Sequence, residues 1–72
     1  MTYSECKKIA LLLNYNINSC REYKEAYYFF NNEGDADGDN GVVVIKETGK
    51  AISFINFILN YSPEKNPKDI EF

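Results

Sequence analysis

The chain has 72 residues, a net charge of -3 at pH 7, no histidine and two cysteines. This length allows one domain with a modest core, because a chain of about this size buries only ~60% of the surface that its unfolded form exposes. The acidic balance without a basic cluster argues against nucleic-acid binding, which depends on neutralising phosphates, and two cysteines are too few for the disulfide framework of a small secreted protein.

A helix is predicted near the N-terminal end of the chain. Thr2 and Glu5 have the spacing of a capping box, in which each side chain accepts a hydrogen bond from the backbone amide of the other residue. Lys7 and Lys8 are expected to face water, and the helix should end near Asn14, where a run of asparagines favours turns. The apolar positions recur at the spacing of one helical face, and they are Cys6, Ile9, Ala10, Leu12 and Leu13.

Two strands are expected in residues 19–31, where the chain is rich in aromatic side chains. Lys24 and Glu25 interrupt this run and suit a tight turn, and Tyr27–Phe30 is the better defined of the two strands. One long helix through EYKEAYYFF is the alternative. The sequence therefore leaves open whether residues 19–25 form a strand or a helix. Four consecutive aromatic residues favour the strand, because they lose rotamer freedom in a helix.

A hairpin and a second helix are expected in the rest of the chain. Gly41–Lys46 is the clearest strand of the sequence, Glu47–Lys50 suits a hairpin turn, and Ala51–Ser53 is the return strand. Phe54–Tyr61 has apolar residues at helical spacing, on a stripe of Phe54, Phe57, Ile58 and Tyr61, with a serine before it as N-cap. This helix should end before Pro63.

These elements predict a single α+β domain over residues 1–72. Its N-terminal helix packs on a small antiparallel sheet of three to four strands, and a short second helix lies near the C-terminus. Residues 63–72 contain two prolines and many charges, and they are expected to form an extended tail that Ile70 and Phe72 pin to the domain.

The segment DADGDNG has the first part of an EF-hand calcium loop. Asp35, Asp37 and Asp39 fill the first three ligand positions of that pattern. Lys46 stands where a bidentate glutamate should complete the site, and strands are predicted on both sides of the loop where an EF-hand has helices. The prediction is therefore no metal and no cofactor, with these three aspartates as the candidate ligands if calcium does bind.

No group of residues indicates catalysis. Without histidine the chain lacks the commonest general base, and its two cysteines match no CxxC zinc pattern. Cys6 lies where a core residue belongs, and Arg21, the one cation next to Cys20, is expected on the opposite face of the strand, so neither thiol is expected to be activated. An enzyme is not expected.

Both faces of the predicted sheet are apolar. Tyr27 and Phe29 point to one face and Tyr28 and Phe30 to the other, because strand side chains alternate. The first helix covers one face, and the other must be covered by the second helix or by another protein. Since aromatic residues are enriched at protein interfaces, the candidate partner-binding residues are Tyr23, Tyr28 and Phe30.

In chain order, the capped helix, the strand YYFFN, the polar loop and the strand-turn unit VVVIKETGK resemble the bacterial immunity protein 35 family. The resemblance extends from Ser4 to about Tyr61, and Lys46, Thr48 and Gly49 match specific positions of its V-x-x-x-K-x-TG strand and turn. It implies a small cytoplasmic bacterial protein, encoded near a toxin, that neutralises the toxin by binding it and carries no catalytic residues.

The sequence therefore predicts a small, non-enzymatic, cytoplasmic module that binds a protein partner, with toxin neutralisation as one form of that function. No contact with nucleic acid is expected, because the chain has no basic cluster, and none with a membrane, because it has no signal-peptide pattern and no apolar run of ~20 residues. Two alternatives stay open. One is a calcium- or metal-responsive domain that uses the loop of residues 35–39, and the other is a structural homo-oligomer, such as a homodimer, that pairs its exposed sheet face.

Overall fold

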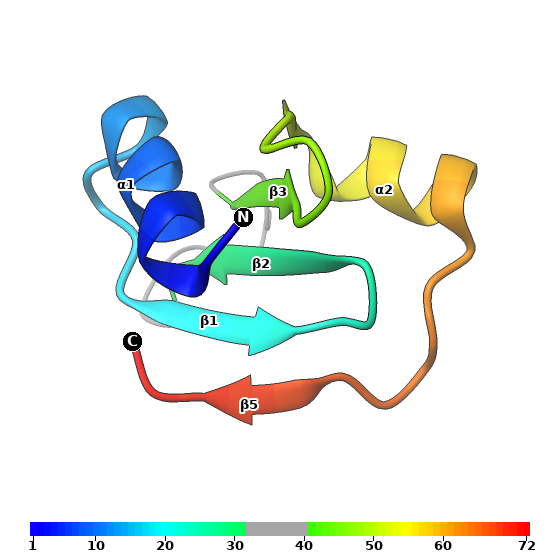
Figure 1. The fold of residues 1–72 in the computed structure, drawn as a ribbon. Coiled ribbons are helices and arrows are strands. Elements are labelled where there is room, and N and C mark those ends of the chain that lie inside the picture. Colours follow the sequence, from blue (N-terminus) through cyan, green and yellow to red (C-terminus); the bar gives the residue numbers. More distant parts are fainter. Residues whose placement is uncertain (32–40) are drawn as a thin grey trace.

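A computed structural model describes residues 1–31 and 41–72 as two helices and one sheet. The strands pair antiparallel in the order β4-β3-β2-β1-β5 (Figure 1). In chain order the elements are α1 (Tyr3–Leu13), β1 (Ser19–Glu22), β2 (Ala26–Phe30), β3 (Val42–Ile45), β4 (Ala51–Ile52), α2 (Phe54–Tyr61) and β5 (Lys68–Ile70). The predicted α+β class is confirmed, as are both helices, but the described sheet has five strands where three to four were expected.

The capping box at the start of α1 is present as predicted. The Glu5 amide donates to Thr2 Oγ1 at 3.2 Å, and the Thr2 amide donates to Glu5 Oε1 at 2.9 Å. The Thr2 amide and the Thr2 hydroxyl both donate to Glu5 Oε1, and these two hydrogen bonds hold the pKa of the Glu5 carboxyl below its usual value. Asn14 caps the other end, where its amide donates to the Ala10 carbonyl at 2.8 Å.

The sheet is buried on both faces by alternate residues of the same strands. Phe29 and Val44 belong to a core beneath α1, into which the helix inserts Cys6 and Ala10. The neighbouring positions of the strands point to the opposite face, where α2 inserts Phe57 into a second core. The strand residues of this second core are Ala26, Val43 and Ile45. Residues 19–25 are therefore strand and turn, and the helical alternative for EYKEAYYFF is excluded.

The apolar stripe predicted for α1 is correct only in its first two turns. Leu12 and Leu13, in the last turn, are 81% and 63% exposed. Lys7, expected to face water, instead crosses to the C-terminal end of the chain. Its Nζ donates to the Phe72 carbonyl at 2.6 Å and lies 4.1 Å from the centroid of the Phe72 ring.

The tail predicted over residues 63–72 is extended, but part of it is strand β5. It pairs with β1 along the outer edge of the sheet, with Cys20 opposite Ile70 and Glu22 opposite Lys68 (Figure 1). Ile70 and Phe72 pack against the core beneath α1, as the sequence suggested. Three residues with two charges give no strand pattern of their own, so backbone pairing with β1 is what makes this segment a strand.

The N-cap of α1 gives a first testable prediction. Thr2→Ala removes the oxygen that accepts from the Glu5 amide, and it should lower the free energy of unfolding by about 1 kcal/mol. Ser4→Ala is the matched control, since Ser4 lies in the same turn with an exposed side chain and no hydrogen bond to the described residues. Urea unfolding followed by circular dichroism compares the two variants, and equal losses of stability would contradict a capping role.

Candidate functional site

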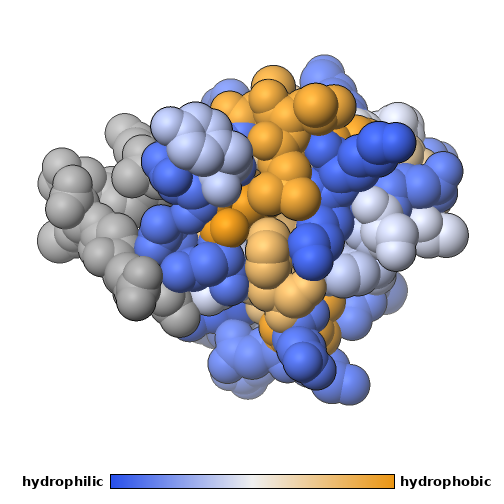
Figure 2. Space-filling model, turned by 90° about the vertical axis from the view of Figure 1, so that its left-hand side faces the viewer, coloured by the Kyte–Doolittle hydropathy of each residue, from blue (hydrophilic) through white to orange (hydrophobic). Residues whose placement is uncertain are grey.

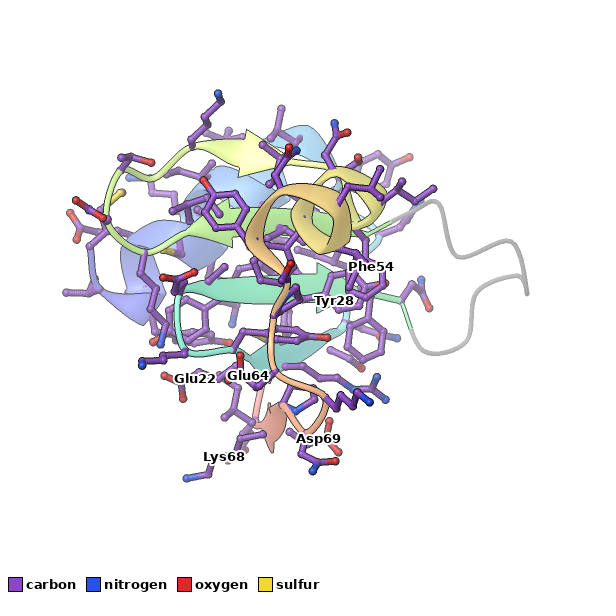
Figure 3. The ribbon with its side chains drawn as sticks, turned by 90° about the vertical axis from the view of Figure 1, so that its right-hand side faces the viewer. Glu22, Tyr28, Phe54, Glu64, Lys68 and Asp69 are labelled. Carbon is purple, nitrogen blue, oxygen red and sulfur yellow. The ribbon has the colours of Figure 1, made fainter. Side chains whose placement is uncertain are left out.

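The sheet face beneath α2 contains one continuous row of side chains that crosses all five strands. The register places Val43 opposite Ile52 and Tyr28, Tyr28 opposite Arg21, and Arg21 opposite Asp69. The row changes along its length from aliphatic to aromatic to charged. Because α2 has only eight residues, it covers the aliphatic part of this face and leaves the rest open (Figure 3).

Tyr23, one of the predicted partner-binding residues, lies in the covered part. Its ring meets the Phe57 ring edge to face, with centroids 5.1 Å apart, and only 5% of the residue is exposed. Burial raises the pKa of its phenol. The structure thus places Tyr23 in the core under α2, where it is not accessible to a partner. The position of Tyr23 in the turn just after β1 did not indicate that it is buried, because its burial depends on a helix more than thirty residues away.

The other two predicted residues, Tyr28 and Phe30, lie together in the open part. The Tyr28 ring stacks on Phe54 from α2 at 4.4 Å and on Phe30 at 5.0 Å, with interplanar angles of 24° and 22°. The Arg21 guanidinium carbon lies 5.1 Å from the Phe30 centroid. We call Phe54, Tyr28, Phe30 and Arg21 the aromatic column. Figure 3 shows Phe54 and Tyr28 side by side, where α2 begins.

The aromatic column ends in a charged pair at the edge of the sheet. Arg21 Nε donates to Asp69 Oδ1 at 2.9 Å, and both side chains are exposed. An exposed pair of this kind contributes only ~0–1 kcal/mol to stability. The same pair holds the guanidinium at a position beside Phe30. The rings of the column are half-buried, and burial raises the pKa of the Tyr28 phenol.

The outer side of α2 is a second apolar feature next to the aromatic column. Ile55, Ile58 and Leu59 are 61%, 42% and 73% exposed, and Tyr61 is also exposed. We call these four residues the α2 surface. The predicted inward stripe is right for Phe57 and partly for Phe54, but wrong for Ile58 and Tyr61. Asn56 and Asn60, about one helical turn apart, mark the outer side of FINFILNY, and Ile58 and Tyr61 lie away from them but are still 42% and 39% exposed.

A further apolar surface lies at the C-terminal end of α1. It consists of Leu11, Leu12, Leu13 and Tyr15, all of them exposed. Figure 2 views the molecule from the α1 side and shows a continuous hydrophobic band across it. The first turns of this helix carry Glu5, Lys7 and Lys8, so charges flank the band. By contrast, residues 51–63 contain no charge.

The structure offers no metal centre in its described part. Asp35, Asp37 and Asp39, the candidate calcium ligands, lie outside the described residues. The loop that contains them connects β2 to β3, as predicted, and an EF-hand loop connects two helices. Within residues 1–31 and 41–72, no three His, Cys, Asp or Glu side chains are grouped so that they could hold a metal ion.

Both thiols lie in the core beneath α1. Cys6 and Cys20 are buried and free of disulfides. Burial, with a smaller contribution from the Glu22 carboxylate, raises the pKa of the Cys20 thiol to about 12. Arg21 points to the other face of the sheet, as expected, so it does not activate this thiol.

No protein-family model, no curated protein and no solved structure matches the chain. Neither of the two helices in the described residues combines the length and hydrophobicity needed to cross a membrane.

Gly41 gives a test of the aromatic column. A Cβ at this position would collide with Cε1 of the Tyr28 ring, so Gly41→Ala must displace the ring from its stack on Phe54. We expect a loss of about 1–3 kcal/mol in unfolding free energy, the usual cost of overpacking, with changed ring-current shifts for Phe54 in NMR spectra. In a Tyr28→Leu background the collision is absent, and Gly41→Ala should be within about 0.5 kcal/mol of neutral. The same loss in both backgrounds would refute this packing.

The buried thiols give a second prediction. Because its pKa is raised, Cys20 stays protonated at pH 8, and the folded chain shields both sulfurs. Ellman's reagent at pH 8 should therefore react with the native protein far more slowly than with the protein in guanidinium chloride, which should titrate two thiols. Rapid release of one equivalent from the native protein would show that Cys20 is an accessible, activated thiol.

Proposed function

We propose that this chain is a small, non-enzymatic module that binds a protein partner through the α2 surface and the adjacent aromatic column. The observation that carries the proposal is that α2 fully buries one residue, Phe57, while Ile55, Ile58, Leu59 and Tyr61 are exposed on a helix without a single charge. An apolar helix of this kind is normally covered. The described elements leave the outer side of α2 uncovered, which favours another protein as its cover.

The energetics favour a partner at this surface. Fully burying a Leu, Ile or Phe side chain is worth ~1.5–3 kcal/mol, so covering Ile55, Ile58 and Leu59 would contribute several kcal/mol before the costs of association. The aromatic column adds stacked rings that are already held in place, and little side-chain entropy is lost when such rings bind. The guanidinium beside Phe30 then gives the surface a polar rim, as protein interfaces have.

The resemblance to the bacterial immunity protein 35 family supports a toxin as this partner and the cytoplasm as the compartment. The three motif residues shape the turn between β3 and β4. Gly49 has a left-handed φ of 75°, Thr48 Oγ1 accepts from the Lys50 amide at 3.2 Å, and Lys46 Nζ is 2.7 Å from Glu22 Oε2. These are structural roles, so they support the fold of such a protein, while the proposed binding residues lie on the α2 surface and the aromatic column.

The proposal is tested by partner capture with two matched double variants. Tagged protein is used to capture partners from cells that encode it, and each protein recovered is purified and titrated back. Ile55→Ser with Leu59→Ser should weaken binding of the specific partner at least tenfold, since each residue of an interface hot spot contributes more than ~1 kcal/mol. If the partner is a toxin, the wild-type chain should also restore growth of cells that express it, and this variant should not.

The control is Leu12→Ser with Leu13→Ser, which removes equally exposed apolar side chains from the α1 end. It should leave both capture and melting temperature unchanged. A partner lost equally with both double variants would show nonspecific adhesion, and one lost only with the α1 variant would place the interface on α1. Turnover of a substrate by the purified chain would exclude a purely binding role.

A further inference from the structure

A cavity of about 350 Å³ lies at the C-terminal end of α2, next to the α2 surface. Two turns and the last helical residue enclose it: Glu25 from the β1–β2 turn, Glu47 from the β3–β4 turn, and Tyr61. The Lys46 amide donates to the Glu25 carbonyl at 2.9 Å, which ties the two turns together. Buried Ile45 also lines the cavity. Its size is at the lower end of the ~300–1,000 Å³ typical of ligand pockets, which suits one side chain.

The charges around this cavity favour a cationic occupant. Four charged residues line it, Lys24, Glu25, Lys46 and Glu47. The Lys46 ammonium is already engaged, 2.7 Å from Glu22 Oε2 and 4.8 Å from the Tyr27 centroid on the opposite face. Glu25 and Glu47 form no ion pair with any described residue. Among the lining side chains, two carboxylates without an ion-pair partner therefore oppose one ammonium, that of Lys24, while the N-terminal ammonium donates to the Lys46 carbonyl at 2.8 Å.

The end of α2 adds to this negative character. The carbonyl end of a helix carries a partial negative charge that favours cations, and the last turn of α2 contains no basic residue. Pro63 follows the C-cap Ser62 and has no amide hydrogen to donate back to the helix. Tyr61 contributes an aromatic ring at the same place, and a guanidinium can stack on such a ring while its donors reach carboxylates on either side.

We propose that this cavity receives an arginine side chain of the protein partner, with its guanidinium against Tyr61 and its N–H groups donating to Glu25 and Glu47. The inference rests on the proposed function, because the cavity shares Tyr61 with the α2 surface. It specifies the partner's chemistry: an apolar patch that covers Ile55 and Leu59, with an arginine at one edge.

The test uses N-acetyl-arginine amide as the probe and N-acetyl-citrulline amide as its uncharged isostere. In NMR titrations of the full chain, the arginine probe should shift the amide signals of Glu25 and Glu47 and the ring protons of Tyr61 in a saturable way. The citrulline probe should not. Added salt should weaken binding, because the contacts are largely electrostatic and exposed. Equal shifts with the two probes, or none with arginine, would overturn the proposal.

Three variants and one control sharpen this test. Glu25→Gln and Glu47→Gln should each weaken arginine binding about two- to fivefold, and Lys24→Gln should strengthen it by a similar factor, which is the range for exposed charge pairs. Glu71→Gln lies outside the cavity and should have no effect. Weaker arginine binding in the Lys24→Gln variant, or loss of arginine binding in the Glu71→Gln control, would also overturn the proposal. Absence of arginine binding while Ile55 and Leu59 still determine partner capture would refute this inference alone and leave the proposed function standing.

Discussion

The structure depends on strand β2 being apolar on both of its faces. Ala26 and Phe29 are both fully buried, yet they point to opposite sides of the sheet. A sheet with two apolar faces needs two covering layers, and this chain must build them from 72 residues. The eleven residues of α1 nearly suffice for one face, and the eight of α2 do not suffice for the other. The open aromatic column follows directly from this shortage.

Local patterns predicted the elements well, because each carries its own chemistry. The Thr2–Glu5 capping box set the start of α1, the β-branched run set β3, and Ser53 set the start of α2, where its hydroxyl accepts from the Asn56 amide at 3.2 Å. Strand alternation also assigned Tyr28 and Phe30 correctly to one face. These features require only neighbours within a few residues, and a sequence displays such neighbours directly.

What the sequence could not predict is decided by contacts between distant segments. Tyr23 is buried because Phe57 reaches it, and β5 is a strand because β1 offers it an unpaired edge. Lys7 turns away from water because Phe72 supplies both a carbonyl and a ring. Ile58 and Tyr61 are partly exposed for another reason: they lie away from Asn56 and Asn60, on the inner half of α2, but only Phe57 of this helix is fully covered by the sheet.

Because the surface of α2 has no charge, a second feature is needed to orient a partner, and the cavity beside it can supply one. Apolar burial is nondirectional, so the α2 surface alone would hold a partner without fixing its orientation or excluding competitors. A cationic side chain placed between Glu25, Glu47 and Tyr61 would fix the register at one end of the helix, and the Arg21 guanidinium beside Phe30 would do so at the other. These two ends differ in what they favour: a cation at one, and at the other, where Asp69 already pairs with Arg21, a π system against the guanidinium. A partner that satisfies both while covering Ile55 and Leu59 would be selected by charge as well as by hydrophobic contact, and specificity in protein recognition arises from such combinations.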